Sequence, residues 1–223
     1  MREGRPPTVR SALRLFATNR TFRPVLSLRL VQEARRRHGQ VAALPFAMLH
    51  RWAARQAGVD LPSHVQVGPG LLLVHAWGTV VHADVRLGAN VTLMHGVTLG
   101  GRSRFTHDGA TVPLGVPVVG DGVWIGPHAV VTGPVHLGDG CRVAPNAVVL
   151  HDVEPACLVA GNPAEVLRRD VPPDITNPAP RRAPALVVSR VRSIAERHVD
   201  QAEEGRAARE PLDVLAHTAG DEG

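Results

Sequence analysis

An aliphatic residue recurs at every sixth position through much of the middle of this chain. The spacing holds through residues 61–73, 81–99 and 119–149, and a small or aliphatic side chain usually stands four positions after each repeat residue. An α-helix repeats about every 3.6 residues and a simple strand about every 2, so neither accounts for a period of six. A short strand followed by a tight turn does, and three such units make one triangular coil. The sequence therefore predicts a mainly β fold of stacked coils.

The composition suits a core made of aliphatic rows. Hydrophobic residues make up 44% of the 223 residues, but aromatic residues make up only 3%, and tyrosine is absent. The 22 glycines and 19 prolines are too many for a helical bundle and suit a fold with many tight turns. The pairs Asp121–Gly122 and Asp139–Gly140 are typical of such turns.

Two interruptions break the repeat. Between Leu73 and Val81 the step is eight rather than six, so two residues are inserted between them. Between Leu99 and Val119 the step is twenty, and we expect residues 102–118 to form a long loop that leaves the coil. Loops of this length in a compact domain are usually functional or disordered, so this one is a candidate lid over a binding site.

Different patterns precede and follow the repeat. Residues 23–38 and 41–57 are predicted to form two helices, with a break at Gly39 and with Pro45 in the first turn of the second helix. Their apolar faces are expected to cover the open edge of the first coil.

We therefore expect three segments. They are an Arg-rich helical segment at 1–58, the repeat domain at 59–170, which is closed by a short strand and turn at 153–170, and a Pro-rich tail at 171–223. The tail is expected to be largely disordered and mobile, with a weak helix near 184–211.

The distribution of charge excludes several classes of function. All 25 basic residues are arginine, so the chain has neither a Schiff-base lysine nor a P-loop lysine. Residues 1–55 hold 12 arginines against two acidic residues, whereas residues 56–170 hold 6 arginines against 9 acidic residues. No nucleic-acid-binding motif accompanies the basic segment, so no nucleic-acid partner is expected.

Membrane and metal chemistry are not expected either. We find no run of about 18 apolar residues and no signal-peptide core, which favours a cytoplasmic chain without a membrane span. Cys141 and Cys157 are the only cysteines, which excludes a disulfide scaffold and an all-cysteine zinc site. No two of the 12 histidines stand five positions apart, so the paired ligands of a repeat-type zinc enzyme are missing and no metal is expected.

Four motifs lie within residues 60–167. They are Asp60 fifteen residues before His75, HAWGTVV at 75–81, VTLMHGVTLGG at 91–101 and VVLHDVEPACLVAGNPAEVL at 148–167. In these motifs the chain resembles the hexapeptide-repeat acyltransferases, and among them most the short serine O-acetyltransferases. The resemblance implies that the coils form a left-handed parallel β-helix and that acetyl-CoA is the acyl donor. It also implies a homotrimer with a cleft between neighbouring subunits.

The same resemblance implies roles for individual residues. His75 is expected to be the general base that removes the proton of the acceptor hydroxyl, and Asp60 is expected to orient its imidazole. His95 stands at the same repeat position as His75, so the two are expected to stack in one column and share the site. The expected contacts with coenzyme A are Gly100, Gly101, Ala129, Ala160, Gly161, Arg168 and Arg169.

The sequence leaves the acceptor open. Val74 stands where the serine enzymes usually carry an Asp, and Gly115-Val116-Pro117 stands where they carry an Arg-His-Pro triple that grips the amino acid. Pro127 replaces a small residue whose N–H could meet the thioester. The polar side chains of the long loop that could bind an acceptor instead are Arg102, Arg104, His107 and Asp108. L-Serine is the favoured acceptor, a sugar or exopolysaccharide is the alternative, and a β-helix scaffold without catalytic activity is the alternative of another class.

Overall fold

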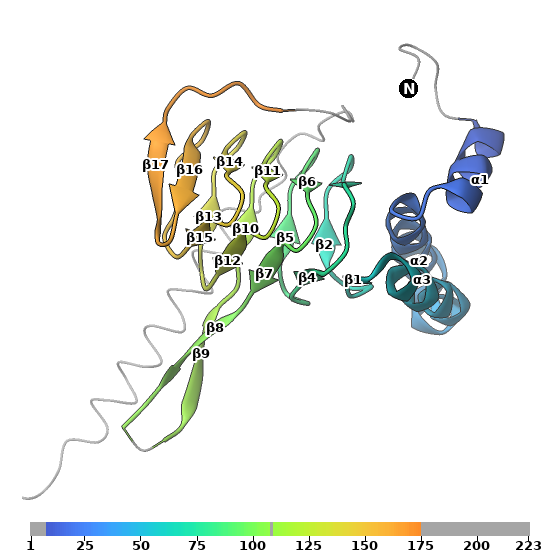
Figure 1. Cartoon of the computed structure of the whole chain (residues 1–223). Helices are drawn as coiled ribbons and strands as arrows, with labels where there is room; N and C mark the ends of the chain where they lie inside the picture. The colour runs from blue at the N-terminus through green and yellow to red at the C-terminus, as the bar shows by residue number, and fades with distance from the viewer. Residues whose placement is uncertain (1–7, 108, 175–223) are drawn as a thin grey trace, which may run out of the picture. The chain divides into compact units, whose positions relative to one another are not determined.

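The computed structural model of this protein describes residues 8–107 and 109–174. Three helices come first, and short strands that wind into stacked coils follow them (Figure 1). The mainly β architecture that the repeat predicts, preceded by helices, is confirmed. The tail helix expected near 184–211 lies outside the described residues.

The N-terminal helices are α1 (Val9–Thr18), α2 (Phe22–Ala42) and α3 (Leu44–Ala57). The sequence pattern does not predict α1, which begins where the Thr8 side chain accepts a hydrogen bond from the Ser11 amide. The other two helices match the predicted pair. Gly39, with a φ of 82°, leaves helical geometry near the end of α2, and Pro45 lies in the first turn of α3.

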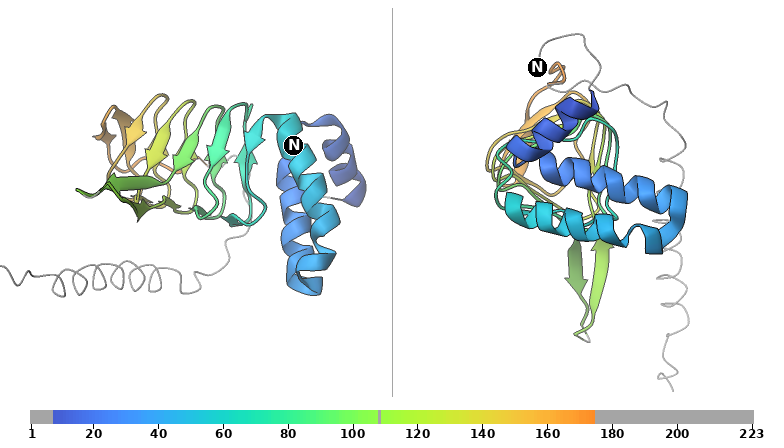
Figure 2. Two further views of the ribbon diagram at one scale, coloured as in Figure 1. Left: turned by 90° about the horizontal axis from the view of Figure 1, so that it is seen from below. Right: turned by 90° about the vertical axis from the view of Figure 1, so that its right-hand side faces the viewer.

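Helices α2 and α3 lie across the open end of the first coil (Figure 2). Leu28 of α2 is fully buried in the same apolar cluster as the interior of the coils. The guanidinium group of Arg29 donates hydrogen bonds to the carbonyl oxygens of Val67 and Gly68. The helices therefore satisfy and cover the backbone of a coil edge that would otherwise be open to another chain.

The coils contribute their strands to three parallel sheets. The first sheet contains β1 (Val59–Asp60), β4 (Thr79–Val81), β7 (Thr98–Gly100), β12 (Val130–Thr132) and β15 (Val148–Val149). The second contains β2 (Gln66–Val67), β5 (Arg86–Leu87), β10 (Val118–Val119) and β13 (His136–Leu137). The third contains β3 (Leu72–Leu73), β6 (Thr92–Leu93), β11 (Trp124–Ile125), β14 (Arg142–Val143), β16 (Leu158–Gly161) and β17 (Ala164–Arg168). Only β17 runs antiparallel in these three sheets, and its hairpin with β16 ends the described stack.

The repeat residues form the interior of the coils. All of them are buried except Val67, which is partly buried. Leu73 pairs with Leu93, and Val80 pairs with Thr98, so the first coil takes seven steps where the second takes five. The insertion of two residues that the sequence predicts is therefore confirmed.

Aspartates link successive coils at the turn between the second and third sheets. The Oδ1 atom of Asp121 accepts a hydrogen bond of 2.7 Å from the Ala89 amide, and that of Asp139 accepts one of 2.7 Å from the Asp121 amide. Gly122 and Gly140 follow with φ values of 65° and 68°. The predicted Asp-Gly turns are confirmed, and each carboxylate ties its coil to the preceding one.

The predicted long loop is a two-stranded hairpin. Strand β8 (Arg102–Phe105) pairs antiparallel with β9 (Thr111–Gly115), and we call residues 102–115 the arm. The arm projects away from the stacked coils, and nearly all of its described side chains are exposed (Figure 1). It leaves the coil directly after β7.

Candidate active site

The strands of the first sheet lie between two sets of turns, and five candidate residues lie at these turns: His75, His95, Gly100, Gly101 and Ala129. The turns that lead into the sheet form what we call the histidine corner, residues 74–78, 94–97, 126–129 and 144–147. The turns that lead out of it form the glycine corner, which includes residues 82–84, 100–101 and 132–133. Strands of two or three residues separate the two corners by about 10 Å.

His75 lies in the first turn of the histidine corner, and its side chain is exposed. Its φ of 55° is uncommon for a residue with a side chain, so the turn has to hold it there. The Trp77 amide donates to the His75 carbonyl at 2.5 Å, and the Trp77 indole lies over Gly58. The guanidinium group of Arg20 lies 4.1 Å from the centre of the same indole. The turn that carries His75 is thus fixed from two sides.

The expected stacking of His75 on His95 is wrong in its register. Because two residues are inserted in the first coil, Trp77 rather than His75 stands opposite His95, and the Gly96 amide donates to the Trp77 carbonyl at 2.7 Å. The ring that contacts His95 is that of His128, with centroids 5.0 Å apart and planes at 90°. All three histidines lie on one corner, in three successive coils.

Sequence reasoning missed His128. Its repeat position is that of Gly96 one coil earlier and of Asn146 one coil later, and both His128 and Asn146 have positive φ values of 58° and 59°. A histidine at a turn position that favours glycine or asparagine is the signal that could have singled it out.

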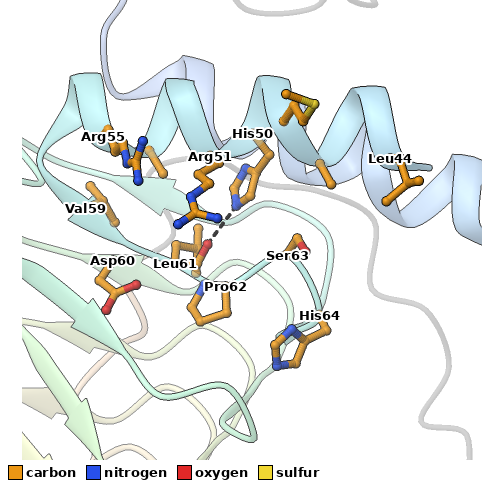
Figure 3. A pocket seen from close by; sticks show the side chains of 13 residues that line it. Leu44, His50, Arg51, Arg55, Val59, Asp60, Leu61, Pro62, Ser63 and His64 are labelled. Atoms are coloured by element: carbon orange, nitrogen blue, oxygen red, sulfur yellow. Dashed lines mark hydrogen bonds between the residues drawn. The ribbon is translucent and has the colours of Figure 1, made fainter. Parts of the chain in front are cut away.

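The structure does not show Asp60 hydrogen-bonded to His75. The Asp60 side chain is exposed on β1, and within residues 8–107 and 109–174 no hydrogen bond or ion pair joins the two. Instead Asp60 lines a cavity of about 560 Å³ between α3 and the first coil, together with Arg51 and Arg55 (Figure 3). The structure therefore leaves the pairing of Asp60 with His75 as a prediction.

A buried histidine stands at the back of this cavity. The Nε2 atom of His50 lies 2.7 Å from the Leu61 carbonyl oxygen (Figure 3), and Nδ1 lies 3.0 Å from the Ser27 hydroxyl oxygen. Because a carbonyl only accepts, Nε2 carries a proton. Burial lowers the pKa of His50, which favours the neutral form with the proton on Nε2. His50 thus joins α2, α3 and the first coil.

The predicted coenzyme A contacts Gly100 and Gly101 lie on the glycine corner. A Cβ at either position would make only ordinary contacts of 3.5 Å or more with the protein. The chain's own packing therefore does not require glycine there, which leaves room for a ligand that approaches from outside. Ala129 is different: it is completely buried inside the coil, and its amide donates to the Gly126 carbonyl. The structure leaves Ala129 no exposed atom with which to contact coenzyme A.

The other predicted cofactor residues lie at the end of the stack. Ala160 and Gly161 end β16, which places Gly161 in line with the histidine corner. Arg169 forms an ion pair with Glu154, which raises the pKa of Arg169. Arg168 is exposed and has no ion-pair partner among the described residues.

The predicted acceptor residues belong to the arm. Arg102, Arg104 and His107 are exposed there, and Asp108 lies outside the described residues. The Arg102 side chain packs over Gly133 of the glycine corner. Because the arm leaves the coil at the glycine corner, one chain does not bring it to His75.

The described residues contain neither a metal-binding cluster nor a helix that could span a membrane. No three of their His, Cys, Asp and Glu side chains are grouped so that they could hold a metal ion. None of the helices described is long and apolar enough to cross a membrane.

The sequence of this chain is similar to those of known acetyltransferases over the repeat region. Residues 117–151 match the family described as bacterial transferase hexapeptide (six repeats). The probable serine acetyltransferase 4 of Oryza sativa subsp. japonica is 46% identical over 121 residues, which are 54% of this chain and 36% of the rice protein. These matches confirm the resemblance to hexapeptide-repeat acyltransferases, and among them to serine acetyltransferases.

Solved structures of serine acetyltransferases are also similar to this chain. The soybean serine acetyltransferase complexed with serine has a TM-score of 0.57 and 31% identity, and the match covers 69% of this chain and 59% of the soybean chain. The serine acetyltransferase of Brucella abortus strain S19 in complex with coenzyme A has a TM-score of 0.56 at 24% identity, over 72% of this chain and 66% of that one, which is a likeness of fold. The chain thus spans about a third of the rice relative and three fifths of the soybean chain.

Proposed function

We propose that this chain is an acetyl-CoA-dependent O-acetyltransferase and that its acceptor is L-serine. The observation that carries the proposal is His75, an exposed imidazole on a turn fixed by Trp77 and Gly58, in a repeat fold that resembles serine acetyltransferases. An exposed imidazole on a fixed turn suits a general base for a hydroxyl group.

In the proposed reaction His75 takes the proton of the acceptor hydroxyl, and the hydroxyl oxygen forms the ester bond to the acetyl carbon. The carbon–sulfur bond of the thioester breaks, and His75 returns the proton to the leaving sulfur. The protein needs no nucleophile of its own. Both cysteines are buried, and burial raises the pKa of the Cys141 thiol to about 12, so that thiol is a poor candidate for one.

Asp60 is proposed to orient the His75 ring when the acceptor is bound. A carboxylate on one ring nitrogen fixes the tautomer and leaves the other nitrogen to take the proton. In the free chain Asp60 faces the cavity beside α3, so this role requires its side chain to turn toward residues 75–78.

We further propose that the coil is left-handed and that the working unit is a cytoplasmic homotrimer. One chain carries His75 at one edge of the first sheet and Gly100–Gly101 with the arm at the other. A neighbouring subunit that brings its glycine corner and arm to the histidine corner completes the site.

A complementation experiment tests this shared site. His75→Ala and Gly101→Trp each remove one half of it, so each variant alone is expected to be inactive. Co-expression of the two is expected to restore activity, because some interfaces then join an intact histidine corner to an intact glycine corner. If the mixture stays inactive while wild-type chains diluted into either variant stay active, the site belongs to one chain and the shared site is wrong.

For coenzyme A we propose that Gly100 and Gly101 face its pantetheine, that Ala160 and Gly161 lie along it, and that Arg168 binds a phosphate. Because Arg169 is held by Glu154, Arg168→Ala is expected to raise the KM for acetyl-CoA several-fold, and Arg169→Ala is expected to change it less. Equal effects of the two variants would show that the ion pair does not occupy Arg169.

A sugar hydroxyl is the second candidate acceptor. One observation favours it: Gly115, which ends the arm, and Val116 and Pro117, which follow it, offer no charged group for a zwitterionic amino acid. A sugar needs no such group.

The deciding experiment measures thiol release from acetyl-CoA in the presence of L-serine or of sugar acceptors. L-Serine is expected to give the higher kcat/KM, and His75→Ala is expected to lose at least about 100-fold in kcat. Sugar-dependent release with none from L-serine would establish the alternative acceptor. No release with any acceptor would favour the scaffold, and full turnover by His75→Ala would show that His75 is not the base.

A further inference from the structure

We propose that His95 donates the hydrogen bond that stabilises the oxyanion of acetyl transfer, and that His128 holds the His95 ring in position for it. This inference rests on the acetyltransferase function proposed above. It gives His95 a role distinct from that of a base, and it adds His128 to the site as a positioning residue.

The histidine corner has no unused backbone donor in the two coils that follow His95. Pro127 and Pro145 have no N–H. The other amides of these two turns all donate within the coils; they belong to Gly126, His128, Ala129, Ala144, Asn146 and Ala147. An oxyanion is usually stabilised by backbone amides. These two turns offer none, so a side chain that reaches the same place is a candidate donor.

The two ring nitrogens of His95 differ in their surroundings. Nδ1 is one of three buried side-chain nitrogen or oxygen atoms in the described residues that lack a hydrogen-bond partner. Nε2 has no partner within the described chain either, but it is not buried, and the residue as a whole is partly exposed. Nδ1 lacks a partner in either tautomer, whereas Nε2 can be reached from outside the corner. The tautomer with its proton on Nε2 presents an N–H there, and this is the form that the proposal requires.

His128 fixes this ring from the next coil. Its amide donates to the His95 carbonyl at 2.9 Å, and its imidazole contacts the His95 ring at 90° with centroids 5.0 Å apart. The His128 ring lies over Gly96, where a Cβ would stand 2.3 Å from Nδ1 of His128. Only glycine at position 96 lets the two rings meet, so Gly96, His95 and His128 act as one unit.

The role follows from the chemistry of the transfer. When the acceptor oxygen bonds to the acetyl carbon, the carbonyl oxygen of the thioester becomes negatively charged. The Nε2–H of His95 donates to this oxygen, and His75 holds the proton that the hydroxyl has lost. The oxygen loses its charge when the carbon–sulfur bond breaks and His75 returns the proton to sulfur. His95 neither gains nor loses a proton in this cycle.

Kinetics on the full-length protein with acetyl-CoA and L-serine test the role of His95. Removal of one oxyanion donor typically lowers kcat about 100- to 1000-fold, and we expect this for His95→Ala with little change in the KM for acetyl-CoA. His95→Gln, whose amide also donates, is expected to recover at least about a tenth of the wild-type kcat. A kcat of His95→Ala within about threefold of the wild-type value would overturn the assignment. We expect only His75→Ala to lose the pH dependence of kcat, so the same loss in His95→Ala would overturn it as well.

Nitrogen-15 NMR of the histidine rings tests the positioning by His128. Wild-type His95 is expected to be the Nε2–H tautomer. His128→Ala is expected to give a mixture of tautomers and a kcat lowered about tenfold. Gly96→Ala should have the same effects, because its Cβ displaces the His128 ring. Gly78→Ala is the matched control: Gly78 also has a positive φ, one coil earlier, but a Cβ there would meet nothing closer than 3.8 Å. This control should leave the His95 tautomer unchanged.

Two results would overturn the positioning role of His128. One is an unchanged His95 tautomer in His128→Ala, and the other is a larger loss of kcat in His128→Ala than in His95→Ala, which would make His128 the donor. The proposed function and this inference fail separately. A wild-type protein without turnover on any acceptor refutes the function, whereas an active wild type with a fully active His95→Ala refutes only the inference.

Discussion

The indole ring of Trp77 lies on Gly58, the residue at which helix α3 ends and the first coil begins. A Cβ at Gly58 would stand 2.2 Å from the ring, and Gly58 has a φ of 67°. The Gly78 amide also donates to the Gly58 carbonyl at 2.9 Å. The end of α3 and the turn that carries His75 are therefore one packed unit.

Gly58→Ala is expected to lower the free energy of unfolding by roughly 2–4 kcal/mol, because it adds a collision with Trp77 to the strain of a positive φ. Gly109→Ala is the matched control, since Gly109 has a φ of 80° but nothing within 4 Å. The control should cost about 1–2 kcal/mol, the strain alone. Urea unfolding of the two variants measures the difference, and equal costs would show that the Trp77 contact contributes nothing.

The fold was largely predictable because one signal repeats many times. Each six-residue unit has an independent chance to show its aliphatic residue, and the pairing of Leu73 with Leu93 shows that even the length of an insertion could be counted. Helix α1 and the arm were less predictable. Helix α1 lies outside the six-residue repeat. Residues 102–105 and 111–115 form strands with no buried face, so their sequences show no hydrophobic alternation.

The site was less predictable than the fold because side-chain neighbours depend on register across coils. Counting from Leu73 places His75 opposite His95, but the inserted residues shift the turn by two positions, and Trp77 takes that place. The contact between His95 and His128 depends on a glycine one coil away from His128. The spacing of residues along the chain does not reveal that the missing side chain of Gly96 leaves space for the His128 ring.

His50 is expected to make stability depend on pH. Burial lowers its pKa in the folded chain, so below the unfolded value of 6.5 the unfolded state binds the proton more readily. The contribution of neutral His50 is therefore complete above pH 6.5 and is lost as the pH falls below it. Thermal unfolding between pH 8 and pH 5 should show a larger decrease in Tm for wild type than for His50→Gln. The exposed His64→Gln is the control and should keep the wild-type slope; an equal slope in all three proteins would contradict the assignment.

Both cysteines are expected to be silent toward thiol reagents in the folded protein. Cys141 is completely buried, burial raises its pKa to about 12, and Cys157 is 1% exposed. An aromatic disulfide reagent should therefore label no thiol in the native chain and two in denaturant. The same result makes that reagent suitable for following coenzyme A release. Rapid labelling without denaturant would mean that the coil opens at the turns where the cysteines lie.

The arm is expected to recognise the acceptor rather than acetyl-CoA. Arg102 and Arg104 are exposed on a hairpin that leaves the coil beside Gly101, and guanidinium groups suit the carboxylate of L-serine. The double change Arg102→Ala with Arg104→Ala should raise the KM for L-serine at least about tenfold and leave that for acetyl-CoA within about twofold. Arg168→Ala is the opposite control, because it should raise the KM for acetyl-CoA alone. If the double variant changes only the KM for acetyl-CoA, or neither KM, the arm does not bind the acceptor. The proposal that L-serine is the acceptor would then lack the cations proposed to bind its carboxylate.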